Sequence, residues 1–239
     1  MVSASDADAL DTDAYTLDEH SLPGGSLLPR LLLVRHGLTD WNRQGRIQGH
    51  SEIELNQVGL AQARALSERL ASETLDAIYA SNLGRARATA EIIAAPHGLP
   101  VQIEPRLCEA NYGAWEGHTM DELRRDDPER ATAWMTEPVD VCPPGGETLE
   151  EVADRVAAVL DELRQRPDDE QIVLVGHGGS VRALLSVALQ IPQGYSRRLR
   201  VDTASLSIIQ LNKDRAMLCS FNDRHHLSDN GNQDRFISL

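Results

Sequence analysis

Two short apolar runs, each followed at once by a histidine beside glycine, constrain the fold of this chain more than any other feature. Residues 31–34 (LLLV) lead into Arg-His-Gly, and residues 172–175 (IVLV) lead into Gly-His-Gly-Gly. A run without polar residues is typical of a strand buried on both faces, as in a parallel sheet. Ligands of open α/β sheets bind at the carboxyl ends of the strands. We therefore expect the two histidines, His36 and His177, to face one pocket.

Helical and strand patterns alternate along the rest of the chain. Helices are predicted at 56–72, 84–98, 148–163 and 180–189, with a shorter one that begins at Pro128. Further strands are predicted at 75–80 and 101–103, and a hairpin is predicted from 205–211 and 216–221. This order predicts a three-layer α/β/α sandwich whose sheet is mainly parallel and has an antiparallel edge.

The chain divides into an acidic start, one domain and an insertion. Residues 1–29 hold six acidic residues and no Lys or Arg, which is typical of a flexible extension and not of a secretory signal. The remaining residues, 30–239, fit one catalytic domain. Within it, residues 110–147 read as a small helical cap insertion, because capping boxes at Thr119 and Thr148 flank a Pro-Pro-Gly-Gly break.

Charge and cysteine content exclude several classes of protein. The net charge of −14 argues against a nucleic-acid binder, and no apolar run approaches the roughly 20 residues that span a bilayer. Three cysteines without a Cys-x-x-Cys pair argue against a disulfide framework or a zinc site. Reduced thiols and a cytoplasmic location are the simplest interpretation. We expect no metal.

Five motifs in a fixed order carry a resemblance to a known family. Arg-His-Gly alone is a weak signal, whereas the ordered set is a strong one. The set resembles the histidine phosphatase superfamily, its phosphoglycerate mutase-like branch 1. The motifs are RHGxTxWN at 35–42 with GRxQG at 45–49, LNxxGxxQA at 55–63, SxLxRAxxTA at 81–90, ExxYGxWEG at 109–117 and GHGG at 176–179.

The resemblance implies a phosphohistidine mechanism. It makes His36 the nucleophile, Glu109 the proton donor and acceptor, and His177 the group that stabilises the transition state. Arg35 and Arg85 would neutralise phosphoryl oxygens, and as adjacent cations they would also keep His36 uncharged. The residues expected to bind phosphate or substrate are Arg35, Asn42, Gln48, Gly49, Arg85, His177 and Gly178.

Two departures from the mutase pattern favour hydrolysis. Glu109 is followed by Ala-Asn-Tyr-Gly, where true mutases usually carry Arg-His-Tyr-Gly, and the segment before His177 is shorter and mixed in charge. The pattern looks more like the α-ribazole and broad-specificity phosphatases. We predict a phosphomonoesterase that acts on a small phosphorylated metabolite without a cofactor. The alternative is a cofactor-dependent phosphoglycerate mutase, which would require 2,3-bisphosphoglycerate.

Two further classes of protein fit the motifs less well. A metallohydrolase could use both histidines and Glu109, but Arg35 and Arg85 would weaken metal binding. A non-catalytic phosphate-binding module would have no use for a nucleophile and an acid. The sequence leaves open the physiological substrate and whether the chain forms a homodimer.

Overall fold

The structure, a computed structural model, contains one six-stranded sheet. It describes residues 29–136, 141–167, 169–212 and 215–227. The strand order is β3-β2-β4-β1-β5-β6. The strands are β1 (Arg30–Arg35), β2 (Ala77–Ala80), β3 (Val101–Ile103), β4 (Gln171–Gly176), β5 (Leu206–Leu211) and β6 (Ala216–Asp223).

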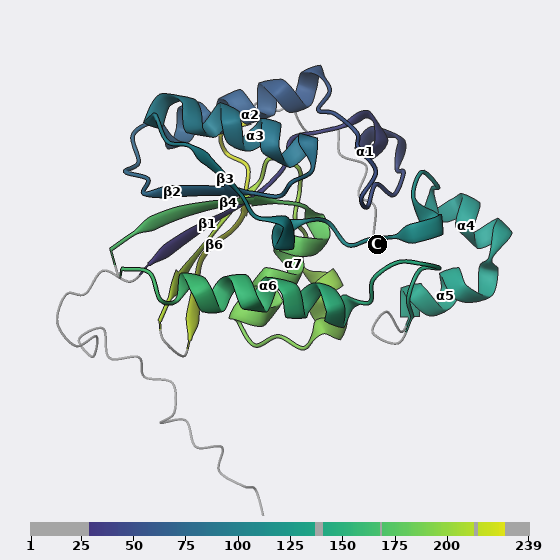
Figure 1. Cartoon of the computed structure of the whole chain (residues 1–239). Coiled ribbons are helices and arrows are strands. Elements are labelled where there is room, and N and C mark those ends of the chain that lie inside the picture. Colours follow the sequence, from purple (N-terminus) through teal and green to yellow (C-terminus); the bar gives the residue numbers. More distant parts are fainter. Residues whose placement is uncertain (1–28, 137–140, 168, 213–214, 228–239) are drawn as a thin grey trace, which may run out of the picture.

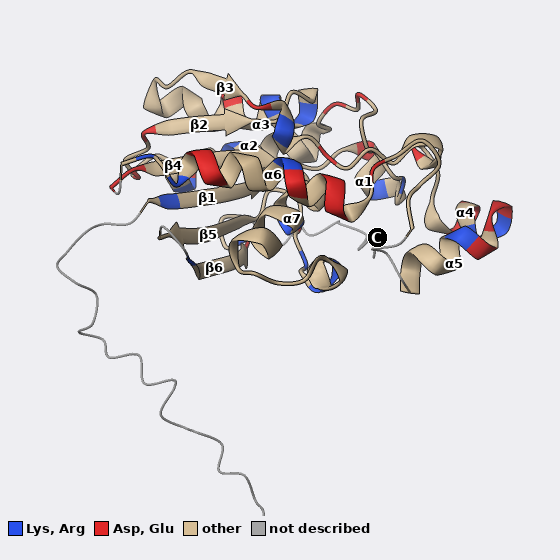
Figure 2. Ribbon diagram, turned by 60° about the horizontal axis from the view of Figure 1, so that its bottom comes forward, with Lys and Arg blue, Asp and Glu red and all other residues tan. Residues whose placement is uncertain are grey.

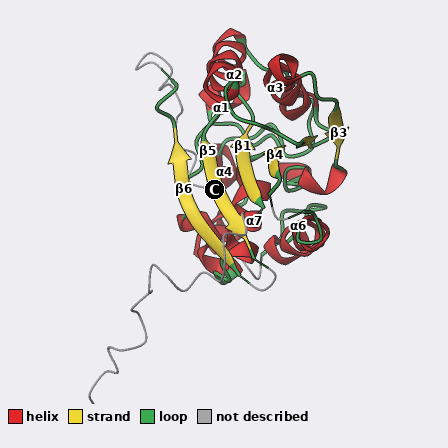
Figure 3. Cartoon of the chain, turned by 90° about the vertical axis from the view of Figure 1, so that its left-hand side faces the viewer, coloured by secondary structure: helices red, strands yellow, loops and turns green. Residues whose placement is uncertain are grey.

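Most of the sheet is parallel, and one edge is antiparallel. The pairs β1–β4, β2–β4 and β2–β3 are parallel, whereas β5 runs antiparallel to both β1 and β6. Figure 3 shows β5 and β6 together at that edge. In the central pair Arg35 lies opposite Gly176, so the residues that follow β1 and β4 leave the sheet side by side.

Helices cover both faces of the sheet, which confirms the predicted three-layer sandwich. Figure 1 shows α2 (Gln57–Leu70) and α3 (Gly84–Ala94) on one face and α6 (Leu149–Leu163) and α7 (Gly178–Ala188) on the other. Side chains alternate along β1. Leu32 and Val34 pack in the cluster with α2 and α3, and Leu31 and Leu33 pack in the cluster with α6 and α7. The run is therefore wholly apolar because both faces are covered.

Two short helices stand to one side of the sandwich, within the segment predicted as a cap. They are α4 (Met120–Asp126) and α5 (Pro128–Thr136), and Trp134 anchors them. Trp134 is 1% exposed, and its ring meets those of Tyr112 and Trp115 edge to face, with centroids 6.1 and 5.5 Å away. The capping boxes predicted at Thr119 and Thr148 both form.

The predicted acidic extension, residues 1–29, lies outside the described residues apart from Pro29. Among the described helices, none combines the length and apolar character that crossing a membrane requires. The remaining elements are α1 (Asp40–Gln44) and the 3₁₀ turns η2 (Ala95–His97), η3 (Pro105–Leu107), η4 (Gly113–Trp115) and η5 (Gln193–Arg198).

The structure differs from the predicted elements by one additional helix and at several element ends, including that of α2 (Leu70 in place of residue 72) and the start of β2 (Ala77 in place of residue 75). Helix α1 was not predicted, and the helix after β4 begins at Gly178 and not at Ser180. The helix predicted to reach Gly98 ends as α-helix at Ala94 and continues as a 3₁₀ turn. Pro96 lies in that turn, and its missing N–H cannot continue the α-helical hydrogen bonds.

Candidate active site

His36 follows β1 directly and is buried. Its Nδ1 lies 2.7 Å from the carbonyl oxygen of Gly37. Because a carbonyl can only accept, Nδ1 carries the ring proton and Nε2 keeps its lone pair. Burial, followed by the charges of Arg85 and Arg35, lowers the pKa of His36 well below the ordinary value. His36 is therefore a neutral imidazole with a free nucleophilic nitrogen.

His177 follows β4 and faces His36, with 5.1 Å between the ring centroids. Its Nε2 lies 2.8 Å from Oγ of Ser81, and that Oγ also accepts from the N–H of Leu83 at 3.2 Å. When the hydroxyl donates to Nε2, the ring proton must lie on Nδ1. This Nδ1 is buried and has no partner among the described residues. In this tautomer Nδ1 can donate to a bound anion.

Two arginines from different elements, Arg35 on β1 and Arg85 on α3, act on His36 through their charges. Arg85 on α3 is fully buried and donates to the carbonyl oxygens of Ser51 at 2.8 Å and Gly49 at 2.7 Å. Its Nε has no partner in the described part of the chain. Arg35 donates to the carbonyl of Val201 at 2.7 Å, and its Cζ lies 3.6 Å from where a Cβ on Gly178 would be.

Glu109 comes from the loop that follows η3 and is half-buried. Its Oε1 accepts from the N–H of Ala110 at 2.9 Å and of Gly179 at 2.9 Å, and its Oε2 lies 3.1 Å from the latter nitrogen. The carboxylate thus sits against the first turn of α7, where backbone N–H groups favour negative charge. The same turn follows His177, so the acid and the second histidine share one helix end.

The predicted phosphate-binding residues Asn42, Gln48 and Gly49 lie on the segment between β1 and α2. Oδ1 of Asn42 accepts from the N–H and hydroxyl of Thr39, at 3.1 and 3.0 Å, which leaves its Nδ2 as the donor for a ligand. Gln48 is buried, and its Oε1 lacks a partner among the residues described. Gly49 has a φ of +50° and presents its carbonyl to Arg85.

The structure therefore brings most of the predicted site residues together. Contacts, a tilted pair of rings and electrostatic interactions link seven of them around one centre: His36, His177, Arg35, Arg85, Glu109, Gly49 and Gly178. Asn42 and Gln48 lie on the segment between β1 and α2, which is joined to this centre through Gly49 and Arg85.

Other polar residues join the site without having been predicted. Glu116 accepts from the N–H of His50 at 2.8 Å and the hydroxyl of Ser51 at 2.6 Å, and so connects the loop at 49–51 to the fourth motif. Glu147 and Arg155 hold the backbone of the Glu109 loop. Motif membership pointed to Ser81 and Glu116, but no sequence signal distinguished Glu147 or Arg155.

A metal ion and a reactive thiol are the two other kinds of catalytic group to consider at this site. In the described ranges, no three His, Cys, Asp or Glu side chains are grouped so that they could hold a metal ion. Burial raises the pKa of the nearby Cys108 thiol to about 11, which keeps the thiol protonated at neutral pH. What remains is a neutral imidazole, a second imidazole, two guanidinium groups and a carboxylate. This set suits transfer of a phosphoryl group, which depends on positioning and charge stabilisation.

Comparison with known proteins agrees with this geometry. The chain is 37% identical over 209 residues to the metal-independent phosphoserine phosphatase of Arabidopsis thaliana, with 86% of each chain covered. It is 38% identical over 182 residues to a Photorhabdus laumondii protein named "Probable phosphoglycerate mutase GpmB", covering 74% of this chain and 83% of that protein. The crystal structure of the α-ribazole phosphatase from Shigella flexneri matches with a TM-score of 0.76 and 31% identity, covering 82% of this chain and 96% of that chain.

The resemblance drawn from the five motifs is confirmed by a family model. The model of the histidine phosphatase superfamily (branch 1) matches residues 31–224, which include every motif and every site residue named above. The chain belongs to the histidine phosphatase superfamily, branch 1, and is an enzyme of that family.

Proposed function

We propose that this enzyme hydrolyses a phosphate monoester of a small metabolite through a phosphohistidine on His36. The proposal rests on the hydrogen bonding and the protonation of His36. Its Nδ1 proton is committed to the Gly37 carbonyl, while burial and two arginines lower its pKa. The lone pair on Nε2 is therefore available at neutral pH, beside cations that can hold the phosphoryl oxygens.

The reaction has two steps on these residues. Nε2 of His36 forms a bond to phosphorus as the bond from phosphorus to the ester oxygen breaks, and Glu109 gives a proton to that leaving oxygen. Water then attacks the phosphohistidine, Glu109 takes a proton from the water, and the bond between nitrogen and phosphorus breaks. Inorganic phosphate leaves and His36 is restored. Arg35, Arg85 and Nδ1 of His177 hold the phosphoryl oxygens in both steps.

We propose further that the reaction needs no metal and no organic cofactor, because the two arginines supply the positive charge that a metal would otherwise supply. Asn42, Gln48, Gly49 and Gly178 complete the binding site for phosphate. Phosphoserine is the first substrate to test, since it is the substrate in the name of the Arabidopsis relative.

The alternative is a phosphoglycerate mutase, and the Photorhabdus relative carries that name. A mutase must keep water away from its phosphohistidine while the substrate is rephosphorylated, which a closed and basic cap favours. Helix α4 instead carries two acidic residues in its first turn and two arginines in its last turn. Figure 2 shows these red and blue residues side by side on α4. Over residues 120–136 the cap carries five acidic residues and three arginines, and a cap that is not basic favours hydrolysis.

The two functions are distinguished by measuring both possible products in the same reaction mixtures. Purified enzyme is incubated with 3-phosphoglycerate, with and without 2,3-bisphosphoglycerate, and with phosphoserine in parallel. Phosphate release and formation of 2-phosphoglycerate are measured together. We expect phosphate release to dominate in every mixture. Isomer formation much faster than phosphate release would replace the proposal with the mutase.

A further inference from the structure

Arg155, on helix α6, holds the loop that carries Glu109 through both terminal nitrogens of its guanidinium. Its Nη1 donates to the carbonyl oxygens of Arg106 and Cys108, each at 2.7 Å. Its Nη2 donates to the carbonyl of Glu109 itself at 3.0 Å. The side chain is only 17% exposed. Three carbonyls within four residues of backbone are thus fixed by one side chain.

Glu147 occupies the other side of the same guanidinium. Its Oε1 lies 3.0 Å from Nε of Arg155, and its Oε2 lies 3.1 Å from Nη2. Glu147 also pairs with Asn111 through two bonds of 2.8 Å, in which each residue's N–H donates to an oxygen of the other. These two residues stand at the two ends of the cap segment. Arg155 and Glu147 therefore join the base of the cap to the loop of Glu109.

His50 connects the loop at 49–51 to the main chain of Glu109. Its Nε2 lies 2.9 Å from the carbonyl oxygen of Glu109 and 4.0 Å from Oε2 of Glu147. The main chain of Glu109 is thus held from two sides by Arg155 and His50. Its side chain is held independently by the N–H groups of Ala110 and Gly179.

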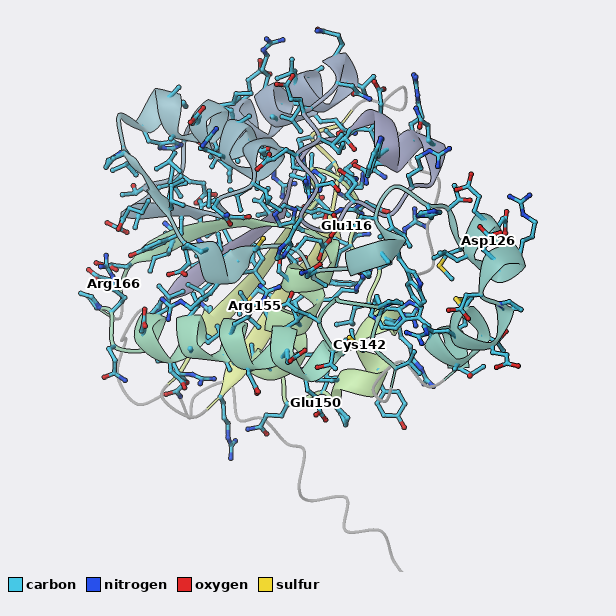
Figure 4. The ribbon with its side chains drawn as sticks, turned by 45° about the vertical axis from the view of Figure 1, so that its right-hand side comes forward. Glu116, Asp126, Cys142, Glu150, Arg155 and Arg166 are labelled. Carbon is cyan, nitrogen blue, oxygen red and sulfur yellow. The ribbon has the colours of Figure 1, made fainter. Side chains whose placement is uncertain are left out.

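We infer that Arg155 is a positioning residue that keeps the carboxyl of Glu109 aligned with the leaving oxygen; this rests on the proposed role of Glu109. Figure 4 shows Arg155 in the interior above α6, whereas Asp126 lies at the outer end of the cap. A guanidinium is needed because its planar fork reaches several carbonyls at once, which an ammonium cannot do. Without the guanidinium the 106–109 loop loses the donors to three of its carbonyls, of which that of Glu109 keeps His50 as a second partner, and it also loses the link to Glu147.

Misalignment of an acid has a specific kinetic signature. An alkoxide leaves only when it receives a proton, whereas p-nitrophenolate leaves readily without one. The value of kcat/KM reports the step in which His36 is phosphorylated and the leaving group departs. Loss of alignment should therefore lower kcat/KM for alkyl phosphates much more than for p-nitrophenyl phosphate. A residue that only stabilises the fold would affect both substrates equally.

The experiment compares Arg155→Met and Arg155→Lys with a matched control. Arg106→Gln removes a neighbouring arginine that also makes two ion pairs, with Glu104 and Glu162, but whose side chain does not touch the Glu109 carbonyl. We expect kcat/KM for an alkyl phosphate that the wild type hydrolyses to fall by about 10- to 100-fold in Arg155→Met, and for p-nitrophenyl phosphate by less than about threefold. Arg106→Gln should change neither.

Arg155→Lys keeps a positive charge beside Glu147, so it covers the case in which Arg155→Met does not fold. We expect it to show the same preference for the aryl substrate, with a thermal midpoint close to that of the wild type. Equal losses on both substrates in the variants that fold would overturn the inference. Glu109→Gln tests the proposed role separately. If Glu109→Gln shows no selective loss of activity on the alkyl phosphate, the proposed role of Glu109 is wrong. If Glu109→Gln shows that loss and the Arg155 variants do not, only the inference about Arg155 is wrong.

Discussion

The backbone N–H of Gly179 lies 2.9 Å from Oε1 and 3.1 Å from Oε2 of Glu109, so one amide holds both oxygens of the carboxylate. Gly179 is the second residue of α7, directly after the turn that contains His177. A Cβ at this position would lie 2.2 Å from Oε1, so only glycine lets the carboxylate approach. The fourth and fifth motifs, far apart in the chain, thereby form one unit at the carboxyl edge of the sheet.

The first prediction concerns the nucleophile. His36→Ala should lower turnover of any phosphate monoester by about a thousandfold or more, because it removes the proposed nucleophile of the covalent step. Acid-labile labelled phosphoenzyme, trapped by rapid quenching at alkaline pH, should disappear with it. Labelled phosphoenzyme at wild-type yield in the variant would show that another residue carries the phosphoryl group.

The second prediction concerns metals. Activity should survive dialysis against excess EDTA, because Arg35 and Arg85 provide the charge that stabilises the phosphoryl oxygens. Vanadate should inhibit in competition with substrate, since its five-coordinate form resembles phosphorus during in-line transfer. An enzyme that EDTA inactivates and Mg²⁺ or Zn²⁺ restores would contradict this prediction.

The third prediction concerns stability at mildly acidic pH. Burial lowers the pKa of both His36 and His177 well below the ordinary 6.5, and Arg85 adds to the effect in each case. Below pH 6.5 the unfolded chain takes up protons that the folded protein does not. The free energy of unfolding should therefore fall as the pH decreases, by up to about 1.4 kcal/mol per pH unit for each histidine.

Denaturant unfolding between pH 7.5 and 5 measures this slope. Ion-paired glutamates such as Glu104 act in the same direction, but only near and below their ordinary pKa of 4.5, so the histidines dominate the window. His226 is half-buried and its lowered pKa adds to the slope. His177→Asn should reduce the slope by one proton. An unchanged slope in that variant would mean that His177 already titrates normally in the folded protein.

Much of the site could be predicted because its reacting groups follow local patterns. His36 and His177 each come directly after a wholly apolar strand, and β1 and β4 are neighbours in a parallel sheet. Glu109 needed the resemblance to a family, because a glutamate in a loop has no local signature. Helix α1 was missed since its capping box pairs Thr39 with Asn42, where glutamate or glutamine is usual.

Arg155 could not be predicted for a different reason. It lies on an amphipathic helix among other charged residues, and such a position normally faces solvent. Its carbonyl partners are 46 to 49 residues away in the chain. Whether an arginine on this helix meets solvent or the Glu109 loop depends on how α6 packs beside that loop. The periodicity of a helix predicts which residues share a face. It does not predict which other segment of the chain contacts a residue at the edge of that face.

The last prediction concerns Gly59, where the first and second motifs touch. A Cβ on Gly59 would lie 2.1 Å from the carbonyl oxygen of Leu38, and a Cβ on Gly37 would lie 2.5 Å from the carbonyl oxygen of Gly59. Both atoms are main chain and cannot move aside alone. Alanine in a helix normally adds about 0.5–1 kcal/mol over glycine, yet here overpacking should reverse the sign and cost about 1–3 kcal/mol. The displaced segment follows His36 directly, so kcat should fall as well.

Gly84→Ala is the matched control, because the atom nearest to a Cβ on Gly84 would be a flexible side-chain oxygen of Glu52, at 3.1 Å. Thermal midpoints and kcat for p-nitrophenyl phosphate check both variants. If Gly59→Ala matches Gly84→Ala in both, the contact between the two motifs does not hold the nucleophile in place.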